Sequence, residues 1–322
     1  MLKLGVVGYG NLGKGVTLAG LAAKDAEIKG VFTKREPSSL VLPCGVKAYR
    51  REELKNFVGE LDALILCGGS AMDLTHDAYE YLEHFVTVDS FDTHAVIREH
   101  VEKADKTAKK YGTLAVVSAG WDPGLFSLSR AVFAAVLPEG ETLTFWGRGV
   151  SQGHSDALRK IDGVLNAVQY TVPDVYALSS AHSGVNPGVP VEKLHSRECY
   201  VALKPHADEV KVEKEIKDFP HYFRGANVKV HFTGEQEIAE RQKDLSHSGE
   251  VIRNGFASGE RVYLSVKLKT ASNPYLTGGI LVAYARAAAR LKKEGKAGAF
   301  TVLDIPVSYL LPEENGRGYE FI

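Results

Sequence analysis

The chain is short of the residues that mark several protein classes. Its 322 residues include 3 cysteines, Cys44, Cys67 and Cys199, which form no C-x-x-C pair. The pattern therefore predicts neither a disulfide framework nor a zinc site. Apolar runs stay far below the ~20 residues of a membrane-spanning helix. The formal net charge of -1 gives no electrostatic reason to expect nucleic acid as a partner. We expect a soluble, cytoplasmic protein with no targeting segment and no membrane partner.

The signature motifs of several enzyme classes are also missing. The chain has no H-E-x-x-H and no complete Walker A motif, since Gly15 follows Lys14 where Ser or Thr is required, which disfavours zinc peptidases and P-loop nucleotide hydrolases. The pentapeptide GVSQG at 149–153 matches G-x-S-x-G, but we expect no nucleophile elbow of the α/β-hydrolase kind. Histidine and cysteine do not cluster at metal-ligand spacing, so we expect no metal. What is present is an ordinary globular composition, with 44% hydrophobic and 25% charged residues. The length favours two domains.

The first third of the chain alternates strand-like and helical patterns. The strand-like runs are 2–8, 27–32, 63–67, 85–88 and 114–118, and the helical patterns are 11–23, 75–83 and 94–111. Such alternation is typical of a parallel sheet covered by helices on both faces. We predict an α/β domain of the Rossmann type, with a doubly wound parallel sheet, over residues 1–120.

After Gly120 the pattern changes to longer strand-like segments joined by polar loops. These segments are 141–147, 198–203, 228–232 and 262–268. We predict a second, α+β domain over 121–271, with a mixed or antiparallel sheet. A helical stretch at 276–291 and a strand-like stretch at 299–302 resume the style of the first domain. Residues 272–322 are therefore predicted to return to it.

A glycine-rich turn joins the first predicted strand to the first predicted helix. It reads Gly8-Tyr9-Gly10-Asn11-Leu12-Gly13. In this setting Gly8 permits a tight turn, Gly10 lets the backbone approach a pyrophosphate, and Gly13 lets the helix lie close to the strand. The helix N-terminus then offers free N–H groups and its positive dipole end. The turn predicts a dinucleotide site, and an ordinary strand-to-helix turn is the alternative.

The end of the second predicted strand distinguishes NAD from NADP. NAD proteins carry an acid there for the ribose 2′-hydroxyl, whereas an arginine accommodates the 2′-phosphate of NADP. The sequence reads Thr33-Lys34-Arg35, with no acid at the strand tip. The guanidinium of Arg35 can make paired, charge-assisted hydrogen bonds to a phosphate. We predict NADP, with a basic surface loop as the alternative.

Carboxylates follow two further predicted strands. Asp92 comes after the fourth strand and Asp122 after the fifth. Ligands of open α/β sheets bind outside the carboxyl ends of the strands, so both carboxylates are predicted on the substrate side, where they suit ammonium groups. A helix cap or turn is the alternative for Asp122. His154 can titrate near neutral pH and suits proton transfer, with a structural histidine as its alternative.

Three more polar residues lie in the second half of the chain. Arg197 stands just before a predicted strand, His247 lies in a predicted loop with Ser and Gly, and Asn273 precedes Pro274. Taken singly, none of them indicates a site.

Together, the longer motifs resemble one enzyme family. VGYGNLG, CGGSAMD, VDSFDTH, SAGWDPGLFSLSR, FWGRGVSQGHSDALR and AVQYTVP look like meso-diaminopimelate dehydrogenase. The similarity runs from Met1 to the GAFTVLDI segment and is weakest between Pro173 and Lys193. It implies NADP-dependent oxidative deamination of the D centre of meso-2,6-diaminopimelate to L-2-amino-6-oxopimelate and ammonia. The reverse reaction is a reductive amination in lysine biosynthesis. The resemblance also implies a homodimer, with a dimerisation and substrate domain following the Rossmann domain.

The same resemblance assigns the site residues. It implies catalytic positions at Asp92, Asp122 and His154, with the two carboxylates near the substrate ammonium groups and the proton-transfer role of His154 left open. Substrate-binding positions are Trp121, Trp146, Ser151, Gln152, Gly153, Thr171, Arg197, His247 and Asn273, among which Thr171, Arg197 and His247 hold the distal L end. Cofactor-binding positions are Gly8, Tyr9, Gly10, Asn11, Leu12, Gly13, Thr33, Lys34, Arg35, Cys67, Gly68, Ser70, Ala71, Asp89, Ser90 and Phe91.

Two alternatives to this function stay open. One is another two-domain NADP reductase of amino-acid metabolism, of the dihydrodipicolinate reductase or homoserine dehydrogenase type. The absence of the histidine and lysine clusters of those enzymes disfavours it. The other is a non-catalytic NADP(H)-sensing protein. Asp92, Asp122, Arg197 and His247 argue against a sensor, which has no need of a polar site for a diacid.

Overall fold

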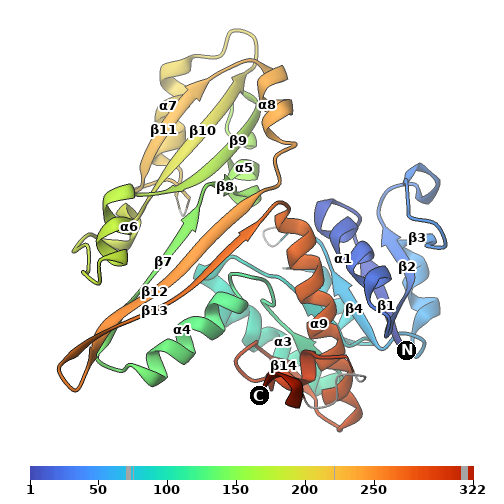
Figure 1. Ribbon diagram of the computed structural model, residues 1–322. Helices are drawn as coiled ribbons and strands as arrows, with labels where there is room; N and C mark the ends of the chain where they lie inside the picture. The colour runs from blue at the N-terminus through green and yellow to red at the C-terminus, as the bar shows by residue number, and fades with distance from the viewer. Residues whose placement is uncertain (70–73, 75, 221, 313–317) are drawn as a thin grey trace. The chain divides into compact units, whose positions relative to one another are not determined.

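The computed structural model describes residues 1–69, 74, 76–220, 222–312 and 318–322, and the chain divides into two units (Figure 1). Unit 1 consists of Met1–Leu128 and Pro274–Ile322, and unit 2 of Ser129–Asn273. The domain boundaries predicted from the sequence, after residues 120 and 271, lie a few residues before these divisions. As boundaries of independently folding domains they stay a prediction.

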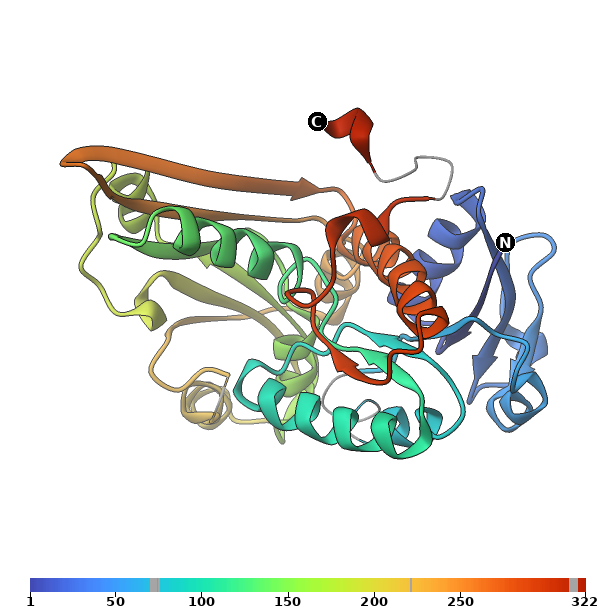
Figure 2. The ribbon, with the colours of Figure 1, turned by 90° about the horizontal axis from the view of Figure 1, so that it is seen from below.

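Unit 1 is built on a seven-stranded sheet in which all paired strands are parallel, in the order β14-β6-β5-β4-β1-β2-β3. Its strands are β1 (Leu2–Val7), β2 (Ala26–Thr33), β3 (Ala48–Arg50), β4 (Ala63–Leu66), β5 (Thr87–Asp89), β6 (Leu114–Val116) and β14 (Gly298–Phe300). The order reverses between β1 and β4, as in doubly wound dinucleotide-binding folds. The Rossmann-type prediction is confirmed. The place of β14 beside β6 confirms the C-terminal return (Figure 2).

The helices of unit 1 follow the strands closely. They are α1 (Asn11–Ala22), α2 (Asp77–Tyr81), α3 (Ile97–Tyr111) and α9 (Asn273–Lys293), with 3-10 turns η1 (Pro37–Ser39), η2 (Arg51–Phe57), η3 (His94–Val96), η5 (Val307–Leu310) and η7 (Tyr319–Phe321). The backbones of α1 and α9 touch where each helix carries a glycine, Gly15 in α1 and Gly278 in α9. A Cβ on Gly15 would lie 2.7 Å from the carbonyl carbon of Pro274, and a Cβ on Gly278 would lie 2.4 Å from that of Gly15. Side chains at this crossing would force the helices apart, so α9 fixes the place of α1.

An ion pair between the buried Arg286 and the half-buried Asp25 attaches α9 to the segment that enters β2. The Arg286 guanidinium donates to both carboxylate oxygens of Asp25, at 2.6 and 2.8 Å, and to the carbonyl oxygen of Leu310 at 2.6 Å. Arg286 is 7% exposed. Its hydrogen bonds lower the pKa of the Asp25 carboxyl below the ordinary value. The C-terminal segment is therefore held to the first domain by charge as well as by packing.

Arg286→Met is expected to lower the free energy of unfolding by about 3 kcal/mol, since it leaves a carboxylate and a carbonyl without their donor. Because the pKa of Asp25 is lowered on folding, the stabilisation is present above the unfolded pKa of about 3.9 and is lost as the pH falls through the folded value. Urea unfolding at neutral and acid pH checks both points. Lys293→Met, which changes an exposed residue of the same helix, is the control. A difference that stays constant into acid would contradict the role of the ion pair.

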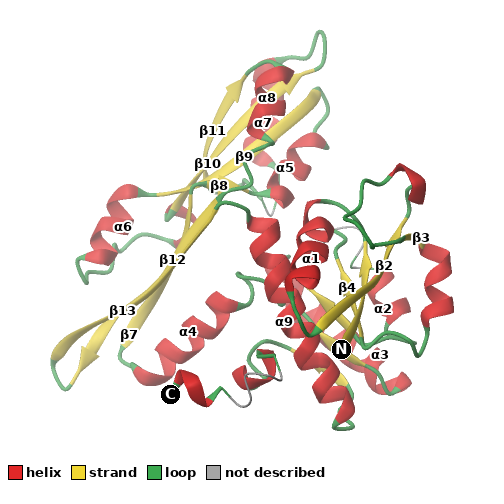
Figure 3. Cartoon of the chain, turned by 45° about the vertical axis from the view of Figure 1, so that its right-hand side comes forward, coloured by secondary structure: helices red, strands yellow, loops and turns green. Residues whose placement is uncertain are grey.

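Unit 2 contains two sheets, where the sequence predicted one. The antiparallel three-stranded sheet has the order β13-β12-β7, and the mixed four-stranded sheet has the order β11-β10-β9-β8 with only β10 and β11 parallel. Figure 3 shows the β12–β13 hairpin. The strands are β7 (Gly140–Gly147), β8 (Gly149–Val150), β9 (Val164–Pro173), β10 (His195–Leu203), β11 (Asn227–Phe232), β12 (His247–Ala257) and β13 (Glu260–Thr270).

Helices and one 3-10 turn complete unit 2. They are α5 (Gln152–Arg159), α6 (Val175–His182), α7 (Glu209–Asp218), α8 (Glu235–Arg241) and η4 (Val191–Lys193), while α4 (Leu125–Val136) crosses the division between the units. A core of Leu158, Ala167, Cys199, Val201 and Ile216 lies under the four-stranded sheet. None of the helices in the described part of the chain has the length and apolarity needed to cross a bilayer.

Two local predictions in unit 2 are wrong. Arg197 lies inside β10, where it pairs with Thr171 of β9, and not before the strand. His247 is the first residue of β12 and not part of a loop. In β12 the ladders to β7 and β13 on both sides outweigh the low strand propensity of serine and glycine, because strand preference depends mainly on the neighbours.

Candidate active site

The glycine turn has the geometry of a phosphate-binding loop. Gly8 has φ 91°, which only glycine adopts without strain. A Cβ on Gly13 would lie 2.9 Å from the carbonyl carbon of Gly8, whereas a Cβ on Gly10 would meet nothing within 4 Å. Gly10 caps α1 without a side chain, and the first turn carries no acid. The N–H groups and positive dipole end of α1 are therefore suited to an anion.

Basic side chains gather where β2 ends. Arg35 Nη2 donates to the carbonyl oxygen of Tyr9 at 2.5 Å, and the backbone N–H of Arg35 donates to Oγ1 of the buried Thr33 at 3.1 Å. The guanidinium is thus held against the glycine turn, as the prediction of a phosphate-binding arginine requires. Tyr9 enters this arrangement through its backbone.

Arg51 is a further cation near the end of β2, and it was not predicted from the sequence. Its Nη1 lies 2.7 Å from Oδ2 of Asp77, and Nζ of Lys34 lies 3.5 Å from the same oxygen. The hydrogen bond from Arg51, and next its charge and that of Lys34, lower the pKa of the Asp77 carboxyl. A second carboxylate, Glu36, pairs with Arg50, and the four cations Lys34, Arg35, Arg50 and Arg51 outnumber these two carboxylates. The end of β2 therefore suits a phosphate dianion. These residues and the α1 N-terminus fit NADP.

Cys67, Ser70 and Ala71 complete the predicted cofactor side. Cys67 follows β4 and packs against the turn, since a Cβ on Gly13 would lie 3.7 Å from its Cβ. Burial raises the pKa of its thiol, so it is a packing residue there and not a nucleophile. Gly68 follows it, and Ser70 and Ala71 lie outside the described residues.

The loops after β5 and β6 carry the predicted carboxylates. Asp92 is exposed and Asp122 half-buried, directly after the buried Trp121, whose ring meets Phe126 edge-on at 5.2 Å. Both carboxylates lie beyond the carboxyl ends of strands, as predicted. The side chain of Asp89 is 2% exposed, so its predicted contact with the cofactor, which stays a prediction, has to be made by its backbone.

In unit 2 the predicted L-end residues come together through strand pairing. Thr171 lies between Arg197 of β10 and Gly149 of β8 in the sheet. Arg197 Nη1 donates to Thr171 Oγ1 at 3.0 Å. The His247 ring packs on Gly149, where a Cβ would lie 2.9 Å from Nδ1. The arginine and the hydroxyl of the four-stranded sheet thus share one patch with the imidazole from β12 of the other sheet.

The environment of the Arg197 guanidinium is typical of a residue that binds an anionic ligand. Burial lowers the pKa of its guanidinium, and its Nε is buried without a hydrogen-bond acceptor. Among the described residues, no carboxylate pairs with it. A buried cation without an anion is costly in a folded chain. An added carboxylate would supply the missing charge and acceptors.

His195 is a second residue that sequence reasoning missed. Its Nε2 accepts a hydrogen bond of 2.8 Å from the backbone N–H of Trp146, and the two rings lie 4.8 Å apart. Burial, and next the charge of Arg197, lower its pKa to about 3. The neutral imidazole therefore fixes Trp146 at the edge of the three-stranded sheet. Its position gave no signal in the sequence.

The segment from Ser151 to His154 begins α5. Ser151 is the N-cap, and its hydroxyl lies 2.7 Å from His154 Nδ1. Gln152 and Gly153 are exposed in the first turn. Burial, and next the charge of Arg197, lower the pKa of His154 to about 3. The expectation that His154 titrates near neutral pH is therefore not met, and a neutral imidazole of such low basicity is a poor proton acceptor.

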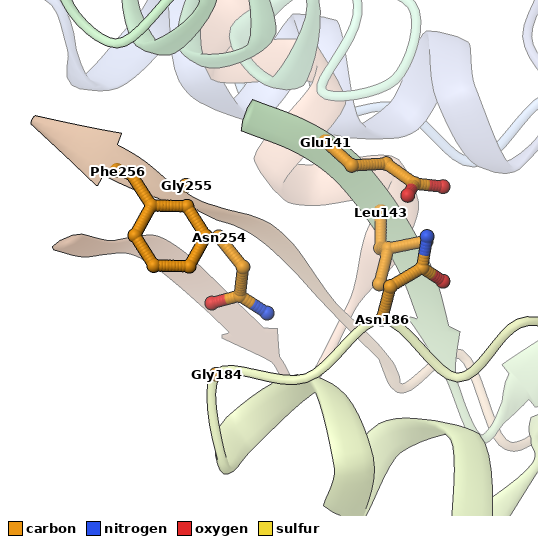
Figure 4. A pocket seen from close by; sticks show the side chains of 7 residues that line it. All are labelled: Glu141, Leu143, Gly184, Asn186, Asn254, Gly255 and Phe256. Atoms are coloured by element: carbon orange, nitrogen blue, oxygen red, sulfur yellow. The ribbon is translucent and has the colours of Figure 1, made fainter. Parts of the chain in front are cut away.

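One pocket of unit 2 is lined by no predicted site residue. A small pocket between β7, β12 and the segment after α6 is shown in Figure 4. It is lined by Glu141, Leu143, Gly184, Asn186, Asn254, Gly255 and Phe256. Asn273, the remaining predicted contact, begins α9, and its N–H donates to the carbonyl oxygen of Leu245 at 2.8 Å. Where the structure describes the chain, no group of three or more His, Cys, Asp or Glu is placed to hold a metal ion.

Comparisons with known proteins agree with the resemblance seen in the motifs. Residues 120–272 match the model of the diaminopimelic acid dehydrogenase C-terminal domain. The chain is 46% identical over 313 residues to meso-diaminopimelate D-dehydrogenase of Ureibacillus thermosphaericus, covering 97% of this chain and 96% of the relative. It is 38% identical over 314 residues to the Corynebacterium glutamicum enzyme of that name, covering 98% and 96%.

Solved structures show the same relationship over nearly the whole chain. The C. glutamicum DAP dehydrogenase in complex with DAP has a TM-score of 0.91 at 38% identity, covering 97% of this chain and 96% of that one. An engineered D-amino acid dehydrogenase bound to NADP+ has a TM-score of 0.89 at 36% identity, with the same coverage. The chain belongs to the meso-diaminopimelate D-dehydrogenase family.

Proposed function

We propose that the protein is an NADP-dependent dehydrogenase that oxidatively deaminates the D centre of meso-2,6-diaminopimelate. The products are L-2-amino-6-oxopimelate, ammonia and NADPH, and the reverse reaction is a reductive amination in lysine biosynthesis. The observation that carries the proposal is Arg197, a buried guanidinium hydrogen-bonded to Thr171 and with no carboxylate partner in the described chain. A substrate with a second amino-acid end supplies that carboxylate.

The distal L end binds to the patch of unit 2 described above. Arg197 receives its carboxylate through charge-assisted hydrogen bonds, and Thr171 and His247 complete the contact. His247 Nδ1 lies 3.0 Å from the carbonyl oxygen of Ser248, so Nδ1 carries the proton. The other substrate-binding positions are Trp121, Trp146, Ser151, Gln152, Gly153 and Asn273.

At the D end, Asp92 and Asp122 bind the ammonium group, and Asp122 accepts a proton. When bound, NADP takes the hydride from the D carbon. The ammonium group loses a proton to Asp122, and loss of the hydride from the resulting amine leaves an iminium ion of the substrate. Water adds to this iminium ion with loss of a proton, and the carbinolamine then releases ammonia and leaves L-2-amino-6-oxopimelate. Holding the C–H bond in place supplies most of the acceleration. His154, with its low pKa, stays neutral and acts as a binding group.

An absorbance assay with isomers of the substrate tests the function. Mixing the protein with NADP and meso-diaminopimelate is expected to give NADPH, and the LL isomer, which has no D centre, is expected to give none. The DD isomer, which lacks the L end that Arg197 and His247 grip, is expected to react more slowly than the meso compound. Binding of NADPH without turnover of the meso compound would instead favour the sensor function.

Arg35→Asp is expected to lower kcat/KM with NADPH by about 10-fold to 100-fold and to leave that with NADH unchanged or higher. The loss corresponds to about 1.4–2.8 kcal/mol, as for removing a charge-assisted phosphate contact. Steady-state kinetics with both cofactors measures it. Arg98→Asp, a charge reversal on the exposed face of α3, is the control. An unchanged preference in Arg35→Asp would rule out this assignment.

The working form is proposed to be a cytoplasmic homodimer. Family membership supports the dimer, and so do the exposed apolar side chains on α4 and on the three-stranded sheet, which are Val132, Val136, Phe256, Tyr263 and Val266. Three free cysteines are typical of a reducing compartment. Sedimentation velocity tests the dimer.

A further inference from the structure

Asp89, the last residue of β5, makes contacts that neither cofactor binding nor the proposed chemistry explains. Its Oδ1 accepts hydrogen bonds from the backbone N–H groups of Phe91 at 2.9 Å and Ser118 at 3.0 Å. Its own carbonyl oxygen accepts from the N–H of Ala119 at 2.8 Å. One buried residue therefore ties the loop after β5 to the loop after β6.

These two loops carry the carboxylates proposed for the D end. Asp92 follows Phe91 directly, and Asp122 lies a few residues beyond Ser118. Ser118 has φ 57°, a left-handed conformation that is uncommon for serine, and its Oγ is buried without a partner. Such a residue persists only where its surroundings hold it. The hydrogen bond from its N–H to Asp89 is one of the contacts that do so.

His100 and Tyr79 fix the orientation of the Asp89 carboxylate. His100 Nε2 lies 3.1 Å from Asp89 Oδ2, and Tyr79 Oη lies 2.8 Å from His100 Nδ1. The His100 ring also stacks on Phe91 at 4.2 Å. Burial, and next the Asp89 charge, raise the pKa of Tyr79 to about 12. The phenol therefore keeps its proton and donates to Nδ1, which leaves the Nε2–H to donate to Asp89.

We propose that Asp89, His100 and Tyr79 form a positioning relay that holds the Asp92 and Asp122 loops in the geometry required for hydride and proton transfer. The proposal rests on the proposed function. Asp89 and His100 are 1% and 3% exposed, so they act through the loops and touch neither substrate nor cofactor with their side chains. Small displacements of reacting groups cost large factors in rate.

Two substitutions of His100 distinguish a role of its hydrogen bonds from a role of its ring packing alone. His100→Phe keeps a ring on Phe91 but removes both hydrogen bonds, while His100→Gln keeps an amide donor for Asp89. His100→Phe is expected to lower kcat with meso-diaminopimelate by about 10-fold to 100-fold, and His100→Gln is expected to recover most of it. His84→Phe, at an exposed histidine of the same unit, is the control and keeps the wild-type kcat.

Hydrogen–deuterium exchange provides a readout that does not need turnover. In His100→Phe, exchange in residues 90–92 and 118–122 is expected to be faster than in the wild type, with the rest of the sheet unchanged. A wild-type kcat in His100→Phe, or equal losses in both His100 variants, would overturn the relay. If the wild type does not turn over meso-diaminopimelate, the proposed function fails, and unchanged exchange would still overturn the relay by itself.

Discussion

Arg197→Met is expected to lower kcat/KM for meso-diaminopimelate by roughly 30-fold to 4000-fold. Truncating one partner of a buried, hydrogen-bonded charge pair costs about 2–5 kcal/mol, and each 1.4 kcal/mol is about a factor of ten. The expected result includes no loss of stability. The guanidinium lacks a carboxylate partner in the described chain and has an unpaired Nε, and replacing a poorly compensated buried charge by an apolar side chain of similar size is often neutral or stabilising.

The substrate specificity of the Arg197→Met variant tests the role of Arg197 as directly as its rate with meso-diaminopimelate does. A simple D-amino acid such as D-alanine has no second amino-acid end, so its turnover is expected to fall much less than that of the meso compound. Thermal unfolding and steady-state kinetics with both substrates give the comparison. Arg224→Met removes a guanidinium of unit 2 that donates to the carbonyl oxygen of Asp218 and serves as the control. Equal losses with both substrates would mean that Arg197 does not bind the distal end.

The cofactor side could be predicted from the sequence because its parts are joined by local rules. In a parallel sheet the carboxyl ends of β1 and β2 lie next to each other, so the turn after β1 and the residues after β2 had to meet. The hydrogen bond from Arg35 to Tyr9 shows that they do. Arg51 could not be predicted, since it comes from η2 and reaches Asp77 of α2 only through the packing of unit 1.

The contacts on the proposed substrate side depend on the register of strand pairing, and the sequence pattern does not give that register. Thr171 and Arg197 are 26 residues apart and meet as a cross-strand pair, and Gly149 brings His247 to the same patch. Single residues gave no signal, and only the family resemblance placed them together. The misplacement of His247 in a loop shows why: the residues that begin β12 are polar and small, and their strand conformation is imposed by two neighbouring strands.

The pKa of His154 was the property that the sequence predicted least well. An isolated histidine has a pKa near 6.5, and the sequence alone leaves His154 at that value. In the structure the ring packs edge-on against Tyr222 and Phe223 and is affected by the charge of Arg197. Both effects disfavour the imidazolium form, and both come from residues far away in the chain. The proposed choice of Asp122 over His154 as proton acceptor therefore rests on the fold.

Gly13→Ala is expected to destabilise unit 1 and to abolish measurable NADPH binding, because its methyl group would overlap the carbonyl oxygen of Gly8. The turn and α1 must then move apart, at a cost of about 1–3 kcal/mol for overpacking, and the N–H groups of α1 leave their place beside the turn. Gly10→Ala separates binding from folding. At Gly10 the backbone is extended, with φ -82°, and a Cβ meets nothing within 4 Å, so alanine fits the protein itself.

The expected result for Gly10→Ala is wild-type thermal stability with NADPH affinity reduced about tenfold or more, which is at least 1.4 kcal/mol. The reason is that, in the proposed cofactor site, the pyrophosphate approaches the backbone through the open space above Gly10. Fluorescence titration with NADPH measures the loss of affinity in each variant, and thermal unfolding measures the loss of stability. The two losses are then compared between Gly10→Ala and Gly13→Ala. If Gly10→Ala binds NADPH as tightly as the wild type, that space does not hold the cofactor. If Gly13→Ala keeps the wild-type stability, the turn and α1 are less closely packed than the structure shows.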